Sequence, residues 1–166
     1  MKRSEVNGIM READEFIRSF GFILPPFAYW TPDEMKARRT SGIVDARLGW
    51  DITDYGKETF DDLGLFLFTT RNGLNADLGK KSAMLYAEKI MISRDQQLSP
   101  MHRHDVKVED IINRGGATMV IELFGSDDEG NCSTDRGGVV VCDGIERAYA
   151  PGEKLKFAPG ESITLM

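Results

Sequence analysis

The first twenty residues carry hydrophobic side chains at spacings of three and four positions. They are Val6, Ile9, Met10, Ala13, Phe16, Ile17 and Phe20. On an α-helix this spacing gathers the side chains on one face. Ser4 is a suitable N-cap and Gly21 a suitable end. The pattern therefore predicts an amphipathic helix over residues 4–20.

A second helix is predicted to begin at Thr31. Threonine is a good N-cap, Pro32 takes the first helical position, and Glu34 follows the cap by three residues. This arrangement is a capping box with proline at the first position. Ser41 and Gly42 follow closely, so we expect a short helix and a helical segment over residues 1–42.

Beyond residue 42 the pattern changes to short apolar runs separated by turn residues. We expect strands at 64–70, 84–92, 118–124, 138–142, 155–157 and 162–165. Turns are predicted at 71–73 and 143–144, and residues 49–62 are expected to form an irregular loop. Many short strands with glycine-rich turns indicate a mainly β sandwich or barrel.

The composition of the chain indicates which classes of binding partner and which cellular compartment to expect. A chain of 166 residues suits one domain. Its net charge is −6 and it has no basic stripe, which argues against nucleic acid. Residues 20–30 are apolar but too short to span a bilayer, and the N-terminus lacks the pattern of a signal peptide. We therefore expect a cytoplasmic protein with no nucleic-acid or membrane partner.

The two cysteines, Cys132 and Cys142, lie ten residues apart with no further cysteine in the chain. We interpret them as reduced thiols, because this pattern and the expected compartment favour neither a disulfide framework nor a metal cluster. A disulfide or a metal role is the alternative.

The only two histidines of the chain, His102 and His104, are two positions apart. On a strand their side chains leave the same face, and two neutral imidazoles can bind one divalent cation. A turn after His104 would bring the Glu109 carboxylate to the same point. Two nitrogens and a carboxylate leave positions open for water or substrate. The alternative is a pair of surface histidines.

Lys107 precedes Glu109 by two residues. On an extended segment both side chains point the same way, and an ammonium group could hold negative charge that develops on a substrate oxygen. The alternative is a solvated surface lysine. Arg103 and Asp105 alternate away from the histidines, and we assign them no role in the chemistry.

The spacing His102-x-His104-x4-Glu109-x6-Gly116 resembles the first conserved motif of the cupin superfamily. Cupins are double-stranded antiparallel β-barrels that hold a metal inside the barrel. The resemblance implies such a barrel here, with an N-terminal helical extension. The glycine that usually leads the motif, six residues before the first histidine, is Gln96 in this chain.

Longer segments are similar to the D-lyxose isomerase family of cupin sugar isomerases. They are MKRSEVN, LPPFAYW and LSPMHRHDVKVEDIINRGGATMVIELF. The resemblance implies a homodimeric isomerase that uses manganese and interconverts D-lyxose with D-xylulose and D-mannose with D-fructose. It makes His102, His104 and Glu109 metal ligands, and Lys107 a catalytic residue. A metal-stabilised enediolate is the expected route, and a hydride shift is its rival.

The same resemblance organises the whole chain as one cupin-like domain, 1–166, with the barrel portion over 60–166. Residues 158–166 (APGESITLM) are similar to the opening of the second cupin motif. The fourth ligand, a histidine, and the proton-transferring base are then expected beyond Met166. We therefore expect an incomplete barrel and a piece of a longer isomerase; a genuine short relative with three protein ligands is the alternative.

Two other functions fit the same three candidate ligands. One is a metal- or sugar-binding cupin without catalysis. The other is an iron cupin dioxygenase, which needs two histidines, a carboxylate and open positions. Turnover of a pentose with manganese, or oxygen consumption with ferrous iron, would distinguish these functions from the isomerase.

Overall fold

The computed structural model describes residues 1–39, 42–81, 84–104 and 107–165. The chain divides into two compact units, Met1–Pro100 and Met101–Met166, which are described separately below. The expectation of a single cupin-like domain over 1–166 stays a prediction. Within the described ranges, no helix is both long enough and apolar enough to cross a membrane.

The first unit begins with the predicted amphipathic helix α1 (Arg3–Ser19). It starts before Ser4, because the backbone N–H of Lys2 donates to the Glu5 carboxylate and so places the cap at Lys2. Gly21 follows the helix with a φ of 76°, which confirms the predicted end.

The predicted capping box opens helix α2 (Pro32–Ala37). The Glu34 backbone N–H donates to the Thr31 hydroxyl at 3.2 Å, and the Thr31 N–H donates to the Glu34 carboxylate at 2.8 Å. The helix is short, as expected, but Ser41 lies outside the described residues. The other helical segments of the unit are η1 (Pro26–Tyr29), α3 (Gly42–Asp45) and η2 (Asn75–Asp77).

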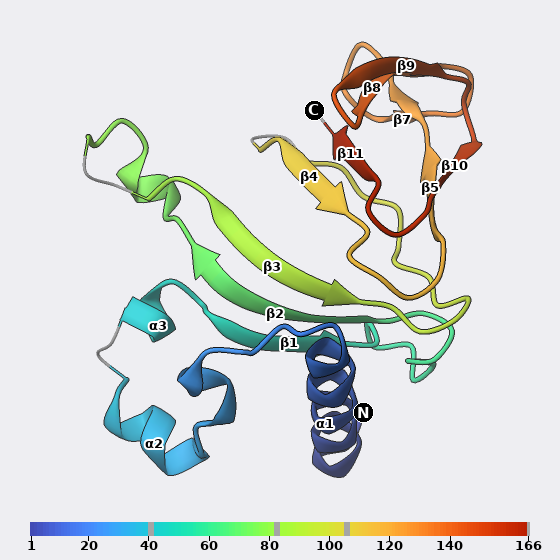
Figure 1. The fold of residues 1–166 in the computed structure, drawn as a ribbon. Coiled ribbons are helices and arrows are strands. Elements are labelled where there is room, and N and C mark those ends of the chain that lie inside the picture. Colours follow the sequence, from blue (N-terminus) through green and yellow to red (C-terminus); the bar gives the residue numbers. More distant parts are fainter. Residues whose placement is uncertain (40–41, 82–83, 105–106, 166) are drawn as a thin grey trace. The chain divides into compact units, whose positions relative to one another are not determined.

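An antiparallel sheet of three strands completes the first unit (Figure 1). Its strands, in spatial order, are β1 (Gly49–Thr53), β2 (Leu65–Asn72) and β3 (Ala87–Ile92). Strand β1 falls where we predicted an irregular loop. Trp50 and Ile52 alternate toward the core, and this short run of two inward side chains was too weak a signal to predict a strand.

The predicted turn at residues 71–73 is also wrong in part. Strand β2 continues through Arg71 and Asn72, which pair with Glu88 and Ala87 after an irregularity at Thr70. The Asn72 side chain donates to the Ala46 carbonyl at 2.9 Å, so a residue that favours turns is held in the strand by a tertiary hydrogen bond.

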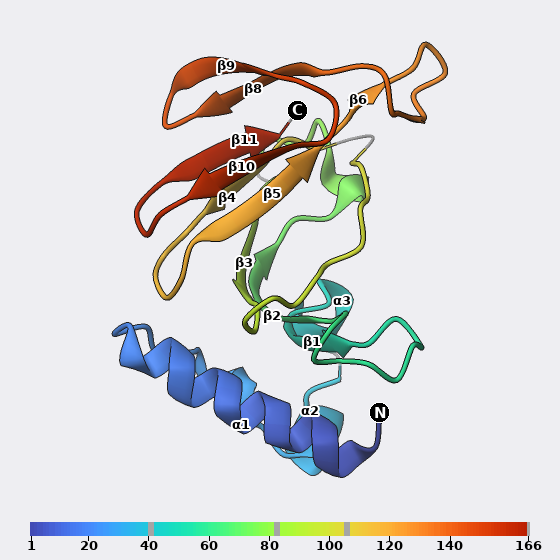
Figure 2. The same cartoon turned by 90° about the vertical axis from the view of Figure 1, so that its right-hand side faces the viewer.

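The core of the first unit forms where one face of α1 meets the sheet (Figure 2). Phe68 on β2 is fully buried, with Phe27 stacked on it at 5.3 Å between ring centroids and Trp50 edge-on at 5.1 Å. The buried residues of α1 are Ile9, Ala13 and Ile17. The predicted face is wider than the buried one, since Phe16 and Phe20 remain exposed and contact each other.

A tight turn at Asp95–Gln96 follows β3. Gln96 has a φ of 56°, in the left-handed region that glycine adopts freely and that costs other residues about 1 kcal/mol. Gln96 stands where the cupin pattern has its leading glycine. The backbone at this position is therefore left-handed, as a glycine would readily allow, although the residue is glutamine.

The second unit consists of antiparallel strands (Figure 2). They are β4 (Glu109–Ile112), β5 (Met119–Leu123), β6 (Gly125–Ser126), β7 (Cys132–Ser133), β8 (Gly138–Cys142), β9 (Ile145–Tyr149), β10 (Glu153–Phe157) and β11 (Ser162–Leu165). They form the sheets β4-β11-β8-β9, β10-β5 and β6-β7. The strand-rich antiparallel fold agrees with the expectation. These sheets do not close into a barrel within the residues that the structure describes.

The two larger sheets of this unit share one apolar core. Its buried members are Leu123, Val140, Leu155, Phe157 and Ile163. The predicted turn at Asp143–Gly144 joins β8 to β9, and both residues have positive φ, at 48° and 82°. Two left-handed residues are what a two-residue antiparallel hairpin requires, so an Asp-Gly pair suits this turn.

Asn113, directly after β4, joins three segments of the second unit. Its buried side chain donates to the carbonyls of Ala117 and Phe157, both at 2.9 Å, and accepts from the Gly115 N–H at 3.1 Å. Its backbone pairs with residues 160 and 161 in the turn before β11. One side chain thus fixes the β4–β5 connection against the end of β10.

Substitution of Asn113 by leucine is expected to lower the free energy of unfolding by about 2–4 kcal/mol. The change removes the partner of the Phe157 carbonyl in a buried contact, and of the Ala117 carbonyl and the Gly115 N–H in part-buried ones. A fully buried group without a partner costs about 1–3 kcal/mol, and the two groups that water can reach cost less. Urea denaturation with a shared m-value measures the loss. Asn131→Ala, at an exposed asparagine, is the control; equal losses in the two variants would contradict the assignment.

Candidate metal centre

The predicted site residues lie in one short segment of the second unit. His102 and His104 have no regular secondary structure, so the strand on which their two side chains would share a face does not form there. Strand β3 ends at Ile92, and the turn at Gln96 and the proline at position 100, which has no N–H to donate, interrupt strand pairing before the histidines. The two imidazole rings still meet edge to face, with centroids 4.8 Å apart.

Glu109 is the first residue of β4 and pairs with Leu165 of β11. Side chains two apart on a strand share a face, so Glu109 projects on the same side as Ile111. Ile111 and Leu165 both pack against the apolar core of the second unit. The carboxylate therefore stands at the edge of that core and is about one-fifth exposed.

Both oxygens of the Glu109 carboxylate have partners. The Nε2 atom of His104 lies 2.8 Å from Oε2, and Lys107 donates from Nζ to Oε1 at 3.0 Å. Burial acts most strongly on the pKa of Glu109 and raises it, but Lys107 and His104 together outweigh burial and bring this pKa below its usual value. The carboxylate is therefore ionised at neutral pH, which is the state that binds a cation.

The donor atoms of His104 and Glu109 suit one divalent cation. Two ligands that bind a cation at about 2.1 Å and about 90° lie about 3 Å apart, close to the spacing of Nε2 and Oε2. His102 contacts the His104 ring. No three histidine, cysteine, aspartate or glutamate side chains form a complete ligand group in the described ranges. The histidine–carboxylate pair fits a metal, and His102 is the neighbouring candidate ligand.

Of the two residues to which we assigned no role, Asp105 lies outside the described residues. Arg103 lies beside Gly130, a contact that the sequence did not indicate. The spacing of the motif also gave no sign that Lys107 and His104 would bind opposite oxygens of Glu109. Cys132 and Cys142 are both free thiols, in agreement with the interpretation from the sequence.

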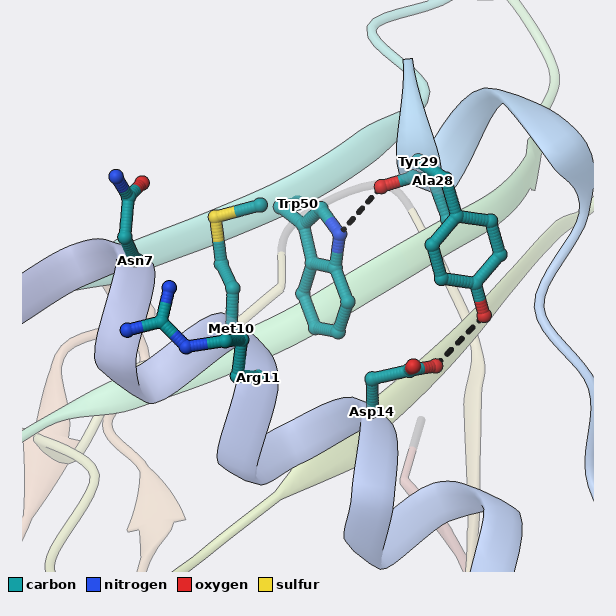
Figure 3. Close-up of a pocket in the computed structure, with 7 residues that line it drawn as sticks. All are labelled: Asn7, Met10, Arg11, Asp14, Ala28, Tyr29 and Trp50. Atoms are coloured by element: carbon teal, nitrogen blue, oxygen red, sulfur yellow. Dashed lines mark hydrogen bonds between the residues drawn. The ribbon is translucent and has the colours of Figure 1, made fainter. Parts of the chain in front are cut away.

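A separate cavity lies in the first unit, between α1, η1 and β1 (Figure 3). Its volume is about 190 Å³, and it is lined by Asn7, Met10, Arg11, Asp14, Ala28, Tyr29 and Trp50. Tyr29 donates to Asp14 at 2.6 Å, and the Trp50 indole donates to the Ala28 carbonyl at 3.2 Å. These lining groups largely bind one another, and no residue predicted for the site lies here.

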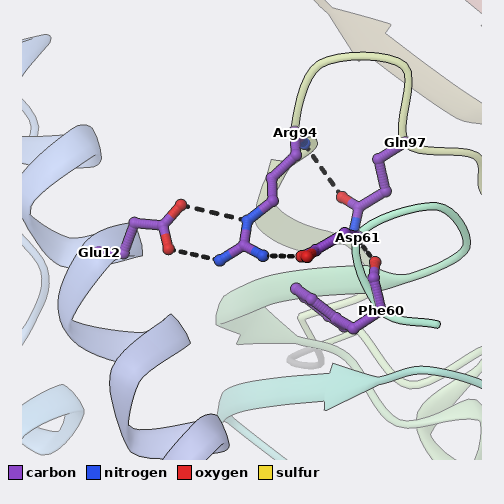
Figure 4. A network of polar contacts seen from close by, with 5 residues as sticks. All are labelled: Glu12, Phe60, Asp61, Arg94 and Gln97. Carbon is purple, nitrogen blue, oxygen red and sulfur yellow. Dashed lines mark hydrogen bonds and ion pairs between the residues drawn. The ribbon is translucent and has the colours of Figure 1, made fainter. Parts of the chain in front are cut away.

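A polar network also joins distant parts of the first unit (Figure 4). Arg94 forms ion pairs with Glu12 of α1 and with Asp61, which precedes β2. Gln97 accepts from the Arg94 backbone N–H at 3.0 Å and donates to the Phe60 carbonyl. Every charge in this network is paired, so it serves to hold α1 and the connection before β2 together.

The fold and the cluster define a strand-rich protein with a histidine–carboxylate pair and a lysine on the second carboxylate oxygen. Comparison with known proteins specifies the family. The family model described as D-lyxose isomerase matches residues 1–166. The chain therefore belongs to the D-lyxose isomerase family and is an isomerase.

Two relatives are both D-lyxose/D-mannose isomerases by name. The one from Serratia proteamaculans is 42% identical over 168 aligned residues, which cover 99% of this chain and 72% of the relative. The one from Escherichia coli O157:H7 is 41% identical, over 99% of this chain and 73% of the relative. Among the three functions that the sequence left open, family membership selects the isomerase over the binding protein and the dioxygenase.

Proposed function

We propose that this chain acts on D-lyxose and D-mannose, converting them to D-xylulose and D-fructose and back. The observation that carries the proposal is the His104–Glu109–Lys107 cluster in a chain that matches the family over its full length. Such a reaction moves one hydrogen between C1 and C2 of an open-chain sugar. Negative charge builds on a substrate oxygen as this happens, so a positive group must lie close to that oxygen.

Manganese is the proposed cofactor, with His102, His104 and Glu109 as its protein ligands. When bound, a divalent cation would polarise the substrate carbonyl as a Lewis acid. The support from the chain itself is the 2.8 Å spacing of the two donor atoms and the lowered pKa of Glu109. Lys107 fixes the orientation of the carboxylate through its second oxygen, the kind of outer contact that tunes a metal ligand.

Lys107 is the proposed catalytic residue. Its ammonium group has three N–H donors and uses one on Glu109, within the residues that the structure describes. The side chain is 44% exposed, so its remaining donors are open to a substrate oxygen. Lys107 would hold or protonate that oxygen as charge develops on it.

A cupin barrel, a homodimer and a cytoplasmic location complete the proposal. The two larger sheets of the second unit share one core, as the two halves of such a barrel would. Large apolar side chains are exposed where β2 connects to β3, and they favour a partner subunit. They are Leu74, Leu78, Met84, Leu85 and Tyr86. Light scattering during size-exclusion chromatography would measure the oligomeric state.

Metal removal tests the proposed function directly. EDTA is expected to stop the manganese-dependent conversion of D-lyxose to D-xylulose. Re-addition of manganese should restore it, because the ligand residues remain in place. The assay follows ketose formation, and circular dichroism checks that the chelated protein is folded. Turnover that persists in a chelated, metal-free sample would contradict the cofactor assignment.

Substitution of Lys107 by alanine is expected to lower kcat by about 10²–10³-fold, the usual cost of removing one donor to a charged transition state. Manganese affinity is expected to weaken about tenfold, because the outer contact to Glu109 is lost, so kcat is measured with manganese at saturation. Lys154→Ala is the matched control, since Lys154 also pairs with a glutamate, Glu122, at 3.7 Å on the surface of the same unit. If the two variants had equal kcat values, Lys107 would be a solvated surface lysine with no part in catalysis.

A further inference from the structure

The segment that carries the two histidines has no strand partner of its own. Residues 101–104 are irregular, and both rings depend on contacts outside a hydrogen-bonded ladder for their positions. Arg103, between the two histidines, provides such a contact within the second unit. Its guanidinium lies against Gly130, in the loop between β6 and β7.

The guanidinium of Arg103, the far end of a flexible side chain, lies in the space that a side chain at position 130 would occupy. A Cβ atom built on Gly130 would lie 2.7 Å from Nη1 and 3.5 Å from Cζ of Arg103. The first distance is closer than real Cβ contacts allow, so any other residue would displace the guanidinium. Gly130 also has a φ of 82°, which glycine adopts without strain. Two separate properties of glycine are therefore used at this position.

Hydrogen bonds within the β6–β7 loop, which Arg103 contacts, hold its backbone in place. Asp127 accepts from the backbone N–H groups of Glu129 and Asn131, at 3.0 and 2.7 Å, and its own N–H donates to the Asn131 carbonyl at 2.9 Å. Asp127, Asp128 and Glu129 make the loop negative, which complements a guanidinium. Arg136 already pairs with Asp128 at 2.6 Å on this hairpin.

We propose that Arg103 is a positioning residue, which docks the histidine segment on the β6–β7 loop through Gly130 and so sets the positions of His102 and His104. The side chains of successive residues diverge, so fixing Arg103 on the loop restricts where its two neighbours can point. The consequence for metal binding rests on the proposed function; the contact itself does not. This revises the interpretation from the sequence, which gave Arg103 no role.

The chain offers a matched pair of glycines for the test. Gly144 has the same φ of 82° as Gly130, but a Cβ atom there meets nothing within 4 Å. Gly130→Ala and Gly144→Ala therefore introduce the same backbone strain, and only the first displaces Arg103. Arg103→Ala is compared with Arg136→Ala. Arg136 follows β7 and pairs with Asp128 of the β6–β7 loop, so this variant removes an arginine from the loop but not from the histidine segment.

The imidazole C–H signals of the metal-free chain provide a readout, because the protein has only two histidines. We expect Gly130→Ala and Arg103→Ala to shift the signals of both histidines toward random-coil values, and Gly144→Ala and Arg136→Ala to leave them in place. Arg103→Lys should give intermediate shifts, because it keeps the charge without the planar guanidinium. Unmoved signals in folded Arg103→Ala, or equal shifts for the two glycine variants, would overturn the proposal.

Manganese affinity then connects the contact to function. Arg103→Ala is expected to weaken binding about tenfold, as loss of an outer contact to a metal ligand does. Arg136→Ala should bind like the parent. A parent chain that binds no manganese would refute the proposed metal site, whereas the imidazole signals would still decide whether Arg103 positions the histidines. Unchanged affinity in Arg103→Ala would overturn the link to metal binding.

Discussion

Glu109→Gln is expected to lower turnover of D-lyxose by about 10³-fold while the fold stays intact. The substitution keeps the size of the side chain and removes the charge that the His104–Lys107 environment stabilises. An amide is a poor ligand for a divalent cation beside two imidazoles. Loss of a Lewis acid forfeits several kcal/mol of transition-state stabilisation, which corresponds to about three orders of magnitude in rate.

The measurement combines kcat with metal content after dialysis. Both should fall together in Glu109→Gln, because the carboxylate is the proposed anionic ligand. Glu122→Gln is the control, since Glu122 pairs with a lysine, Lys154, on the surface of the same unit. If Glu109→Gln retained the manganese content of the parent, Glu109 would have to be removed from the ligand set.

Phe68→Ala is expected to lower the free energy of unfolding by about 3–5 kcal/mol, the usual cost of removing a buried phenylalanine ring. Phe68 is fully buried at the centre of the first core, between Phe27 and Trp50. The sheet and α1 both contribute to this core, so the cavity cannot close by moving one loop. A large fraction of the stability of an ordinary domain would be lost.

Chemical denaturation of the parent and the variant measures this loss. Phe20→Ala is the control, because Phe20 is 49% exposed and its ring packs edge to face against another exposed ring, Phe16. We expect the control to lose less than about 1.5 kcal/mol, the upper range for one aromatic pair. A similar loss in both variants would show that Phe68 is not the centre of the core.

The parts of the fold that follow from local chemistry could be predicted from the sequence. The capping box at Thr31 and the Asp-Gly turn at residues 143–144 are set by hydrogen bonds and backbone preferences within four residues. Strand β1 and the end of β2 depend on contacts between residues far apart in the sequence, such as that of Asn72 with the Ala46 carbonyl. No local sequence pattern predicts such contacts. Closure of the sheets into a barrel also depends on contacts between distant segments, so it stays a prediction.

The candidate site divides in a similar way. The residue types and spacing of His102, His104 and Glu109 indicated metal chemistry because ligand sets are short patterns. The contact of Arg103 with Gly130 joins residues 27 positions apart, and a lone glycine in a polar loop gives no sign of what it faces. The variants described above test the proposed roles of Glu109 and Arg103 in metal binding.

The three ligands proposed within this chain, His102, His104 and Glu109, lie within the eight consecutive residues 102–109. A cation held by so short a segment closes only a small loop, which costs little chain entropy. The unfolded chain, with two imidazoles two residues apart, would therefore retain part of its affinity for the cation. Binding to the unfolded state reduces the stabilisation that a ligand gives the native one. Manganese should thus raise the melting temperature less than its native affinity implies, and a newly synthesised chain could acquire the ion before it folds.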